Sequence, residues 1–402
     1  MKLLLTETQA AADKAVVLED LILTTDMPTT GGSMMLGGYM SLFNATVVEN
    51  LKAAGYGIAG KANIGEFCFD LMGETSYFGA CTNGEGNLTT AANLLLADGA
   101  AQAVVGMDVN GVQRRAAAQA GQVCVKPTYG TVSRFGTIAV ACSGEAVCVT
   151  AANAAAAKEV LAAIAGHDDN DGTSLPQERC EAAQAAEPFA SKKIALAKSL
   201  VDSADDAVKA KIDAFVAFAQ AAGYQVEEID DAILAAARPA WNICMSAELC
   251  NNVSRFDGIK YGYRTPNYET LDELYTNSRT EAFGTLLKDT ILYGSEMLSE
   301  DNYMPMYDKS LRIRRVVCEE FGRIFADYAL VLMPAAGKAA YAPAEAEADK
   351  FLCFKENVYT APASISGMPA VVVGGVQLVG PAFSDGALLA LAQEFEAAQE
   401  VC

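Results

Sequence analysis

The stretch KKIALAKSLVDSADDAVKAKIDAFVAFAQAAGYQVEEI (192–229) decides the fold class. Its first part, KKIALAKSL, has the short apolar run of a strand. DDAVKAKIDAFVAFAQAAGY spaces its apolar residues as a helix does, and YQVEEI again has the pattern of a strand. A strand, a helix and a second strand in succession are typical of an α/β protein with a parallel sheet.

The same alternation continues on both sides of this stretch. Before it, the pattern predicts a helix at 45–55, a strand at 56–63, a helix leading into a short strand at 91–106, and an alanine-rich helix at 149–166. After it, ADYALVLMPA and GMPAVVVGGVQL carry few charges, as strands covered on both faces do. We therefore expect an α/β fold with a central mixed, largely parallel twisted β-sheet covered by helices on both faces.

Residues 232–328 are mostly helical in pattern, and strand-like segments resume after them. We interpret this region as a helical insertion or covering layer within one domain that spans residues 1–402. The segment AAYAPAEAEADK (339–350) has the biased Pro/Ala/Glu composition that predicts a mobile loop.

The composition excludes several classes of function. The chain has 402 residues, 52% of them hydrophobic, and a formal net charge of −21. A surface this acidic repels phosphate backbones and anionic lipids, so we expect no direct binding to nucleic acid or to a membrane. No apolar run is long enough to span a bilayer, and the N-terminus is too polar after Leu5 for a signal peptide. These features predict a cytoplasmic protein.

Cysteine and histidine give no sign of a metal site. The eleven cysteines are scattered without CxxC pairs, so we expect them to be reduced and mostly buried. His167 is the only histidine, which disfavours histidine-dependent catalysis and metal binding. We predict no metal and no cofactor.

Several motifs in a fixed order indicate a family. They are TTGGSMML (29–36), GKANIGEF (60–67), ETSYFGACTN (74–83), KPTYGTVSRFG (126–136), RFDGIKYGYRT (255–265) and TAPASISGMPAVVV (360–373). Together they resemble the amidase-signature family, and within it the A subunits of glutamyl-tRNA(Gln) amidotransferases. The resemblance runs from about Val17 to the C-terminus, and the family's usual N-terminal helices are missing.

The resemblance implies a mechanism for cleaving amides. Family members use a lysine as base, a middle serine as proton relay and a last serine as nucleophile, because a hydroxyl attacks only when a neighbouring base takes its proton. In amidotransferases, the ammonia released from glutamine passes to a partner B subunit.

By this resemblance the chain keeps a lysine, Lys61 in GKANIGEF, but has lost the nucleophile. The family's Ser-Asp-Thr-Gly-Gly-Ser stretch corresponds to MDVNGV (107–112), which places Val112 where the attacking serine belongs. Asp108 and Gly111 survive from that stretch. Asn110 replaces a glycine of a turn that would supply oxyanion-hole N–H groups, and Asn tolerates the left-handed conformation, so we expect the turn to persist.

The relay serine is also replaced. The family's glycine- and serine-rich loop corresponds to GNLTTAANLL (86–95), where Leu88, Thr89 or Thr90 takes the serine's place. A threonine hydroxyl can act as a relay. Alternatively, Thr89 and Thr90 form the N-cap of a helix that starts at Ala91, which we favour.

By the same resemblance, the residues that bind the substrate in the family are also replaced. The family's arginine for the glutamine carboxylate falls in LLKDTI (286–291), where Asp289 and Thr290 stand, and an aspartate there repels a carboxylate. The family's aspartate for the substrate's amino group corresponds to the uncharged Asn357.

Two functional hypotheses follow. The first is a catalytically inactive pseudoenzyme that acts as a scaffold or binding subunit, with transamidosome-like B or C subunits, an active paralogue or a second copy as partner. The second is an amide hydrolase or an amidotransferase A subunit with a rewired site. In that site Lys61 acts as the base, and the nucleophile is Thr89 or Thr90, or a cysteine such as Cys81 or Cys124. We also expect Asp108 to be the charge partner of Lys61, or else a turn residue.

Overall fold

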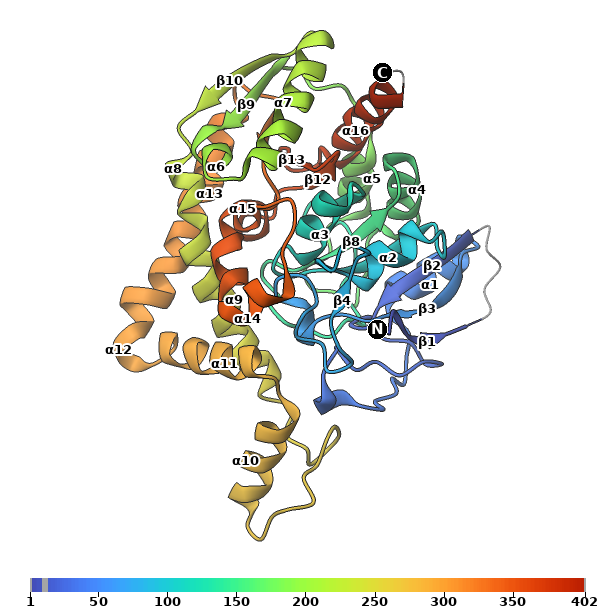
Figure 1. Cartoon of the computed structure of the whole chain (residues 1–402), viewed down its shortest axis with the longest axis vertical. Helices are drawn as coiled ribbons and strands as arrows, with labels where there is room; N and C mark the ends of the chain where they lie inside the picture. Colours follow the sequence, from blue (N-terminus) through green and yellow to red (C-terminus); the bar gives the residue numbers. More distant parts are fainter. Residues whose placement is uncertain (1, 9–13, 401–402) are drawn as a thin grey trace.

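The structure is a computed structural model that describes residues 2–8 and 14–400 (Figure 1). These residues form an eleven-stranded sheet in the order β1-β3-β2-β6-β8-β7-β12-β13-β11-β9-β10. The strands are β1 Leu4–Glu7, β2 Ala15–Glu19, β3 Gly57–Ala62, β6 Ala103–Asp108, β7 Val123–Lys126, β8 Ala146–Ala151, β9 Lys193–Ala197, β10 Gln225–Ile229, β11 Leu330–Met333, β12 Ala370–Val373 and β13 Val376–Val379. Strands β4 (Cys81–Thr82) and β5 (Leu88–Thr89) form a separate hairpin.

The sheet is mixed, as expected for this α/β fold. Parallel pairs lie toward its two ends, β3 with β2 and β2 with β6 at one end, and β10 with β9 and β9 with β11 at the other. The strands between them, from β6 through β8, β7, β12 and β13 to β11, pair antiparallel. All residues of these six strands are buried, which explains why their sequences lack the alternation of a half-exposed strand.

Helices cover both faces of the sheet (Figure 1). Val123 and Val125 of β7 belong to the large core cluster with Val160 and Leu161 of α4, whereas Cys124 packs with Ala117 and Ala118 of α3. Because successive side chains of a strand point to opposite faces, α4 (Ala154–Ile164) and α3 (Val112–Ala120) lie on opposite sides. The helices α1 (Thr46–Ala53) and α16 (Asp385–Glu400) pack against α4.

Residues 232–324 form a run of helices beside the sheet (Figure 1). They are α8 Ala232–Ala235, α9 Ala237–Val253, α10 Leu271–Ala282, α11 Thr285–Met297, α12 Glu300–Asn302, the π-helix η4 Tyr303–Asp308 and α13 Lys309–Ile324. The central helix α9 packs against α11, α13 and α15 (Leu352–Ser366). Helix α10 projects from this group at the lower end of Figure 1.

Most of the expected elements are confirmed. The segment 192–229 forms β9, then the short helix α6 (Lys198–Asp202) and α7 (Asp206–Ala221), then β10, with β9 and β10 parallel. The expected helix at 149–166 begins only at Ala154, because the residues up to Ala151 complete β8. No helix in the described ranges is long and apolar enough to cross a membrane.

The interpretation of 339–350 as a loop is wrong in its centre, where α14 (Pro343–Ala348) forms. Proline is favoured at the first position of a helix, where its missing N–H costs no hydrogen bond. The Glu345 carboxylate accepts a hydrogen bond from the backbone N–H of Ala342 at 3.0 Å. This contact closes the first turn, so local capping outweighs the biased composition.

Candidate functional site

The turn in which the sequence predicts the nucleophile position joins β6 to α3. Gly111 has a φ of +75°, in the left-handed region, and its N–H donates to Asp108 Oδ1 at 3.2 Å. A Cβ at this position would lie 2.4 Å from Cβ of Thr360. The turn therefore persists as predicted, but Gly111, and not Asn110, takes the left-handed conformation.

The side chain of Asn110 forms hydrogen bonds with two other segments of the protein. Its Nδ2 donates to the carbonyl of Phe69 at 2.7 Å, and its Oδ1 accepts from Trp241 Nε1 at 3.0 Å. Both ends of the amide are thus used inside the protein. Its side chain is fully buried and holds α9 against the turn.

Val112 is the first residue of α3 and lines a small cavity. Its side chain is 2% exposed, and Thr89, Thr90, Cys68, Cys81 and Gln113 line the same space. The volume open to the centre of a water molecule is about 10 Å³. Since a single water needs about that much, the cavity has no room for an amide substrate.

Thr89 and Thr90 line this cavity, and the hydroxyl group of each accepts a hydrogen bond from Asn93. Thr90 is the N-cap of α2 (Ala91–Ala97), and its Oγ1 accepts from the N–H of Asn93 at 3.2 Å, which confirms the capping interpretation for this residue. Thr89 lies opposite Cys81 in the β4–β5 hairpin, and its Oγ1 accepts from Asn93 Nδ2 at 3.3 Å. Leu88 is buried beside them.

Lys61 does not line this cavity. Its Nζ donates to Thr29 Oγ1, and burial lowers its pKa to about 8, although the negative charge of Asp20 opposes that shift. The neighbouring residue Ala62 packs with Cys81 and Ala91, which line the cavity. Because side chains alternate along β3, Lys61 must point away from that side of the sheet.

The expected pair between Lys61 and Asp108 is wrong. Asp108 forms an ion pair with Arg114, whose Nε lies 2.6 Å from Asp108 Oδ2, and both side chains are fully buried. The nearby Arg114 guanidinium lowers the pKa of Asp108 despite its burial. Arg114 also donates to Gln377 Oε1 at 2.8 Å and to Ser364 Oγ at 2.7 Å, so Asp108 and Arg114 join α3 to β13 and α15.

The acidic residue that lines the cavity is Glu19, at the end of β2. Its Oε2 accepts from the N–H of Met107 at 2.8 Å, and its Oε1 accepts from Gln113 Nε2. Burial raises the pKa of Glu19 to about 8, and the charge of Asp108 adds to the shift. Sequence reasoning missed this residue, although an acid that ends the apolar run AVVLE was a signal.

Cysteine chemistry has little support at this site. Cys68 Sγ lies 3.9 Å from Glu19 Oε2, and burial raises the pKa of both Cys68 and Cys81, which disfavours the reactive thiolate. Cys124 lies elsewhere, in a core cluster with Cys148. Among the described residues, no group of three or more His, Cys, Asp or Glu side chains could hold a metal ion.

The predicted substrate positions lie outside the cavity lining. Asp289 forms an ion pair with Lys350, and Thr290 is buried in α11, where its hydroxyl donates to the carbonyl of Leu286 at 2.7 Å. The amide of Asn357 is buried, 2.6 Å from Asn242 Oδ1. Each side chain thus has a partner inside the protein.

Comparison with known proteins fits this arrangement of strands and motifs. A sequence model of the family described as Amidase matches residues 15–389. The chain belongs to the amidase family. As an amidase-family protein it is similar to the A subunit of glutamyl-tRNA(Gln) amidotransferase from Latilactobacillus sakei subsp. sakei (strain 23K), with 34% identity over 406 residues that cover 97% of this chain and 83% of that protein. The corresponding protein of Streptococcus pneumoniae (strain 70585) is 34% identical, in a match that covers 95% of this chain and 82% of that protein.

Solved structures of other proteins share the fold. The A subunit of glutamyl-tRNA(Gln) amidotransferase from Thermotoga maritima superposes with a TM-score of 0.80 at 24% identity, covering 98% of this chain and 87% of that one. The urea amidolyase of K. lactis gives a TM-score of 0.79 at 21% identity, covering 95% of this chain and 23% of that one.

Proposed function

We propose that this amidase-family protein does not hydrolyse amides and acts as a scaffold or binding subunit. The observation that carries this proposal is that Val112, at the position that the family resemblance assigns to the nucleophile, lines a cavity of about 10 Å³. Valine has no hydroxyl to attack a carbonyl, and the cavity admits no substrate. In a serine hydrolase, loss of the nucleophile alone costs about 10⁶ in rate.

The charges around the cavity support the same proposal. A general base must reach the proton that it removes. The Nζ of Lys61 is bonded to Thr29, outside the cavity lining, whereas Glu19 lines the cavity and is mostly protonated at neutral pH because its pKa is about 8. A protonated carboxyl cannot act as the base.

The alternative is an amide hydrolase or an amidotransferase A subunit with a rewired site. The 34% identity to such proteins favours it, as does the position of Thr89, Thr90 and Cys81 around one cavity. Lys61 would then have to turn toward that cavity to activate one of them. The relatives are named A subunits, which supports a partner subunit in both proposals. We propose transamidosome-like B or C subunits, an active paralogue or a second copy as the candidates.

Ammonia release separates the two proposals. Purified protein is incubated with glutamine, asparagine and simple amides, and ammonia is measured against a buffer control. We expect none above background. Release that Lys61→Ala, Thr90→Ala or Cys81→Ser abolishes would establish the rewired enzyme. Purification from the native host, with the bound subunits identified by mass spectrometry, then tests the scaffold role.

A further inference from the structure

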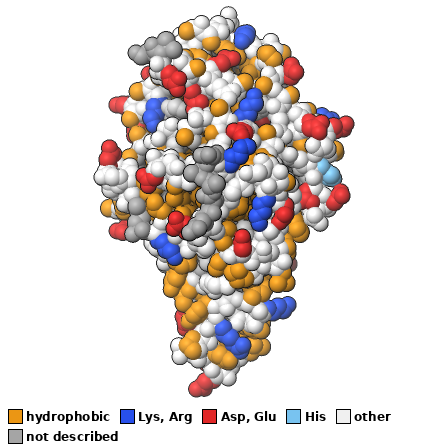
Figure 2. All heavy atoms as spheres, turned by 90° about the vertical axis from the view of Figure 1, so that its right-hand side faces the viewer, with side chains coloured by type: hydrophobic (Ala, Val, Ile, Leu, Met, Phe, Trp, Pro, Cys, Tyr) orange, Lys and Arg blue, Asp and Glu red, His pale blue; other side chains and the backbone are white. Residues whose placement is uncertain are grey.

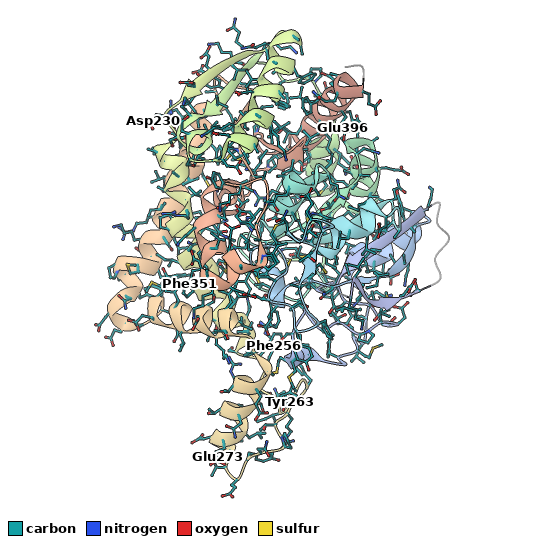
Figure 3. The ribbon with its side chains drawn as sticks, viewed as in Figure 1. Asp230, Phe256, Tyr263, Glu273, Phe351 and Glu396 are labelled. Carbon is teal, nitrogen blue, oxygen red and sulfur yellow. The ribbon has the colours of Figure 1, made fainter. Side chains whose placement is uncertain are left out.

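Helix α10 and the loop before it form a lobe that projects from the body (Figure 1). Figure 3 labels Phe256, Tyr263 and Glu273 on this lobe. The inner side of α10 is buried at Leu274, Ser278 and Ala282. Two large apolar side chains of α10 are nevertheless exposed: Leu271, at the N-terminal end of this buried stripe, is 62% exposed, and Tyr275, one turn later and at its edge, is 37% exposed.

A groove of about 350 Å³ runs between α10 and α11. Tyr275 and Leu292 are among its apolar lining residues, and its charged lining residues are Arg279 and Lys288, with no acid among them. The whole chain has 50 acidic and 29 basic residues and is therefore negatively charged, whereas the lining of this groove is positively charged. Figure 2, which views the molecule from the right-hand side of Figure 1, shows hydrophobic, basic and acidic side chains together on its narrow lower part.

The two cations of the groove are held in place. Arg279 Nη1 donates to the carbonyls of Val253 at 3.0 Å and Phe256 at 2.8 Å, and its guanidinium lies over the ring of Phe283. Lys288 Nζ donates to the carbonyl of Thr280 at 3.1 Å. Positions fixed in this way give the groove a stable positive charge.

Asp272 supplies an opposite charge at the other end of the same helix. It is exposed, and within the described part of the chain it makes no hydrogen bond or ion pair. It precedes Thr276 by one turn and therefore shares the face that carries Thr276 and Arg279. The outer face of α10 is thus acidic near its N-terminus and basic near its C-terminus.

We propose that a second copy of this chain packs its α10 antiparallel against this face. An antiparallel pair centred between Tyr275 and Thr276 places Asp272 of each copy opposite Arg279 of the other. The same register brings Tyr275 of each copy close to Thr276 of the other, beside the two-fold axis. Each surface is its own complement, as a two-fold interface requires, and the antiparallel helix dipoles also attract. This proposal is independent of whether the protein hydrolyses amides.

Light scattering coupled to size exclusion, over a range of protein concentrations, tests the proposal on the full chain. We expect a dimer that weakens at least about tenfold in dissociation constant in Asp272→Arg, because that change opposes Arg279 with a like charge. Tyr275→Asp should weaken it similarly. The matched control is Leu42→Glu, which removes an apolar residue that is 95% exposed outside this face and should leave the dimer unchanged.

Cross-linking tests the register. Thr276→Cys lies beside the proposed axis and should join two copies through a short bis-maleimide, whereas Ser295→Cys on the exposed side of α11 and the parent protein should not. A monomer at all concentrations would overturn the proposal. So would a dimer that persists unchanged in Asp272→Arg and Tyr275→Asp, since another face would then hold it.

Discussion

At the scale of single residues, Glu19 is a buried acid that costs stability. Its pKa is about 8 in the folded chain, above the ordinary value of 4.5. Below pH 4.5 both states are protonated. Between these values the unfolded chain ionises while the folded chain keeps its proton, so the free energy of unfolding falls as the pH rises. This is opposite to the trend for a carboxylate that is paired in the folded state.

Glu19→Gln should therefore stabilise the protein, by on the order of 3 kcal/mol at pH 7 and by much less at pH 5. The new amide can accept from the N–H of Met107. If the Gln113 side-chain amide, whose Nε2 now faces Glu19, turns over, the new NH2 can also donate to Gln113 Oε1, a buried atom that lacks a partner in the structure. Chemical denaturation at both pH values measures the difference. Glu347→Gln, at an exposed site, is the control and should have no such pH dependence. An equal effect of Glu19→Gln at both pH values would contradict the assigned pKa.

At the scale of elements, the β6–α3 turn depends on glycine for two separate reasons. Gly111 combines a φ of +75° with a neighbouring Thr360 side chain, whereas Gly99 has a φ of +67° and no atom within 4 Å of the place that a Cβ would occupy. Gly111→Ala should cost about 3 kcal/mol or more, and Gly99→Ala only about 1 kcal/mol. Thermal or urea unfolding of the two variants compares them. Equal losses would show that the contact with Thr360 adds nothing to the conformational cost.

Helix α2 depends on its cap at Thr90. Thr90→Ala should lower the free energy of unfolding by about 1 kcal/mol, because the N–H of Asn93 loses its acceptor. Thr90→Ser keeps a hydroxyl and should be nearly neutral. Urea unfolding of the three proteins measures this series. A Thr90→Ser variant as unstable as Thr90→Ala would mean that the methyl group, and not the hydroxyl, matters.

At the scale of the whole molecule, local pattern predicted more of the fold than of the site. The spacing of apolar residues located β9, α7 and β10, and a hydroxyl before Ala91 located the cap of α2. The face on which Lys61 lies depends on how β3 is placed between β1 and β2, which no local signal specifies. The same pairing places Glu19 beside Ala62, on the side of the sheet that faces the cavity. The sequence shows an acid at the end of an apolar strand, but only the tertiary structure shows that this acid lines the cavity.

The net charge of −21 predicts how the whole molecule responds to salt. Like charges spread over one compact surface repel one another and destabilise the folded state. Raising the ionic strength from about 0.01 M to 0.15 M shortens the screening length from about 30 Å to about 8 Å, which suppresses this repulsion. The melting temperature should therefore rise by a few degrees in NaCl at pH 7.5, measured by circular dichroism. The increase should shrink toward the isoelectric point near pH 4.5, where the net charge vanishes. A melting temperature that falls with salt would mean that attractive ion pairs such as Asp289–Lys350 outweigh the overall repulsion.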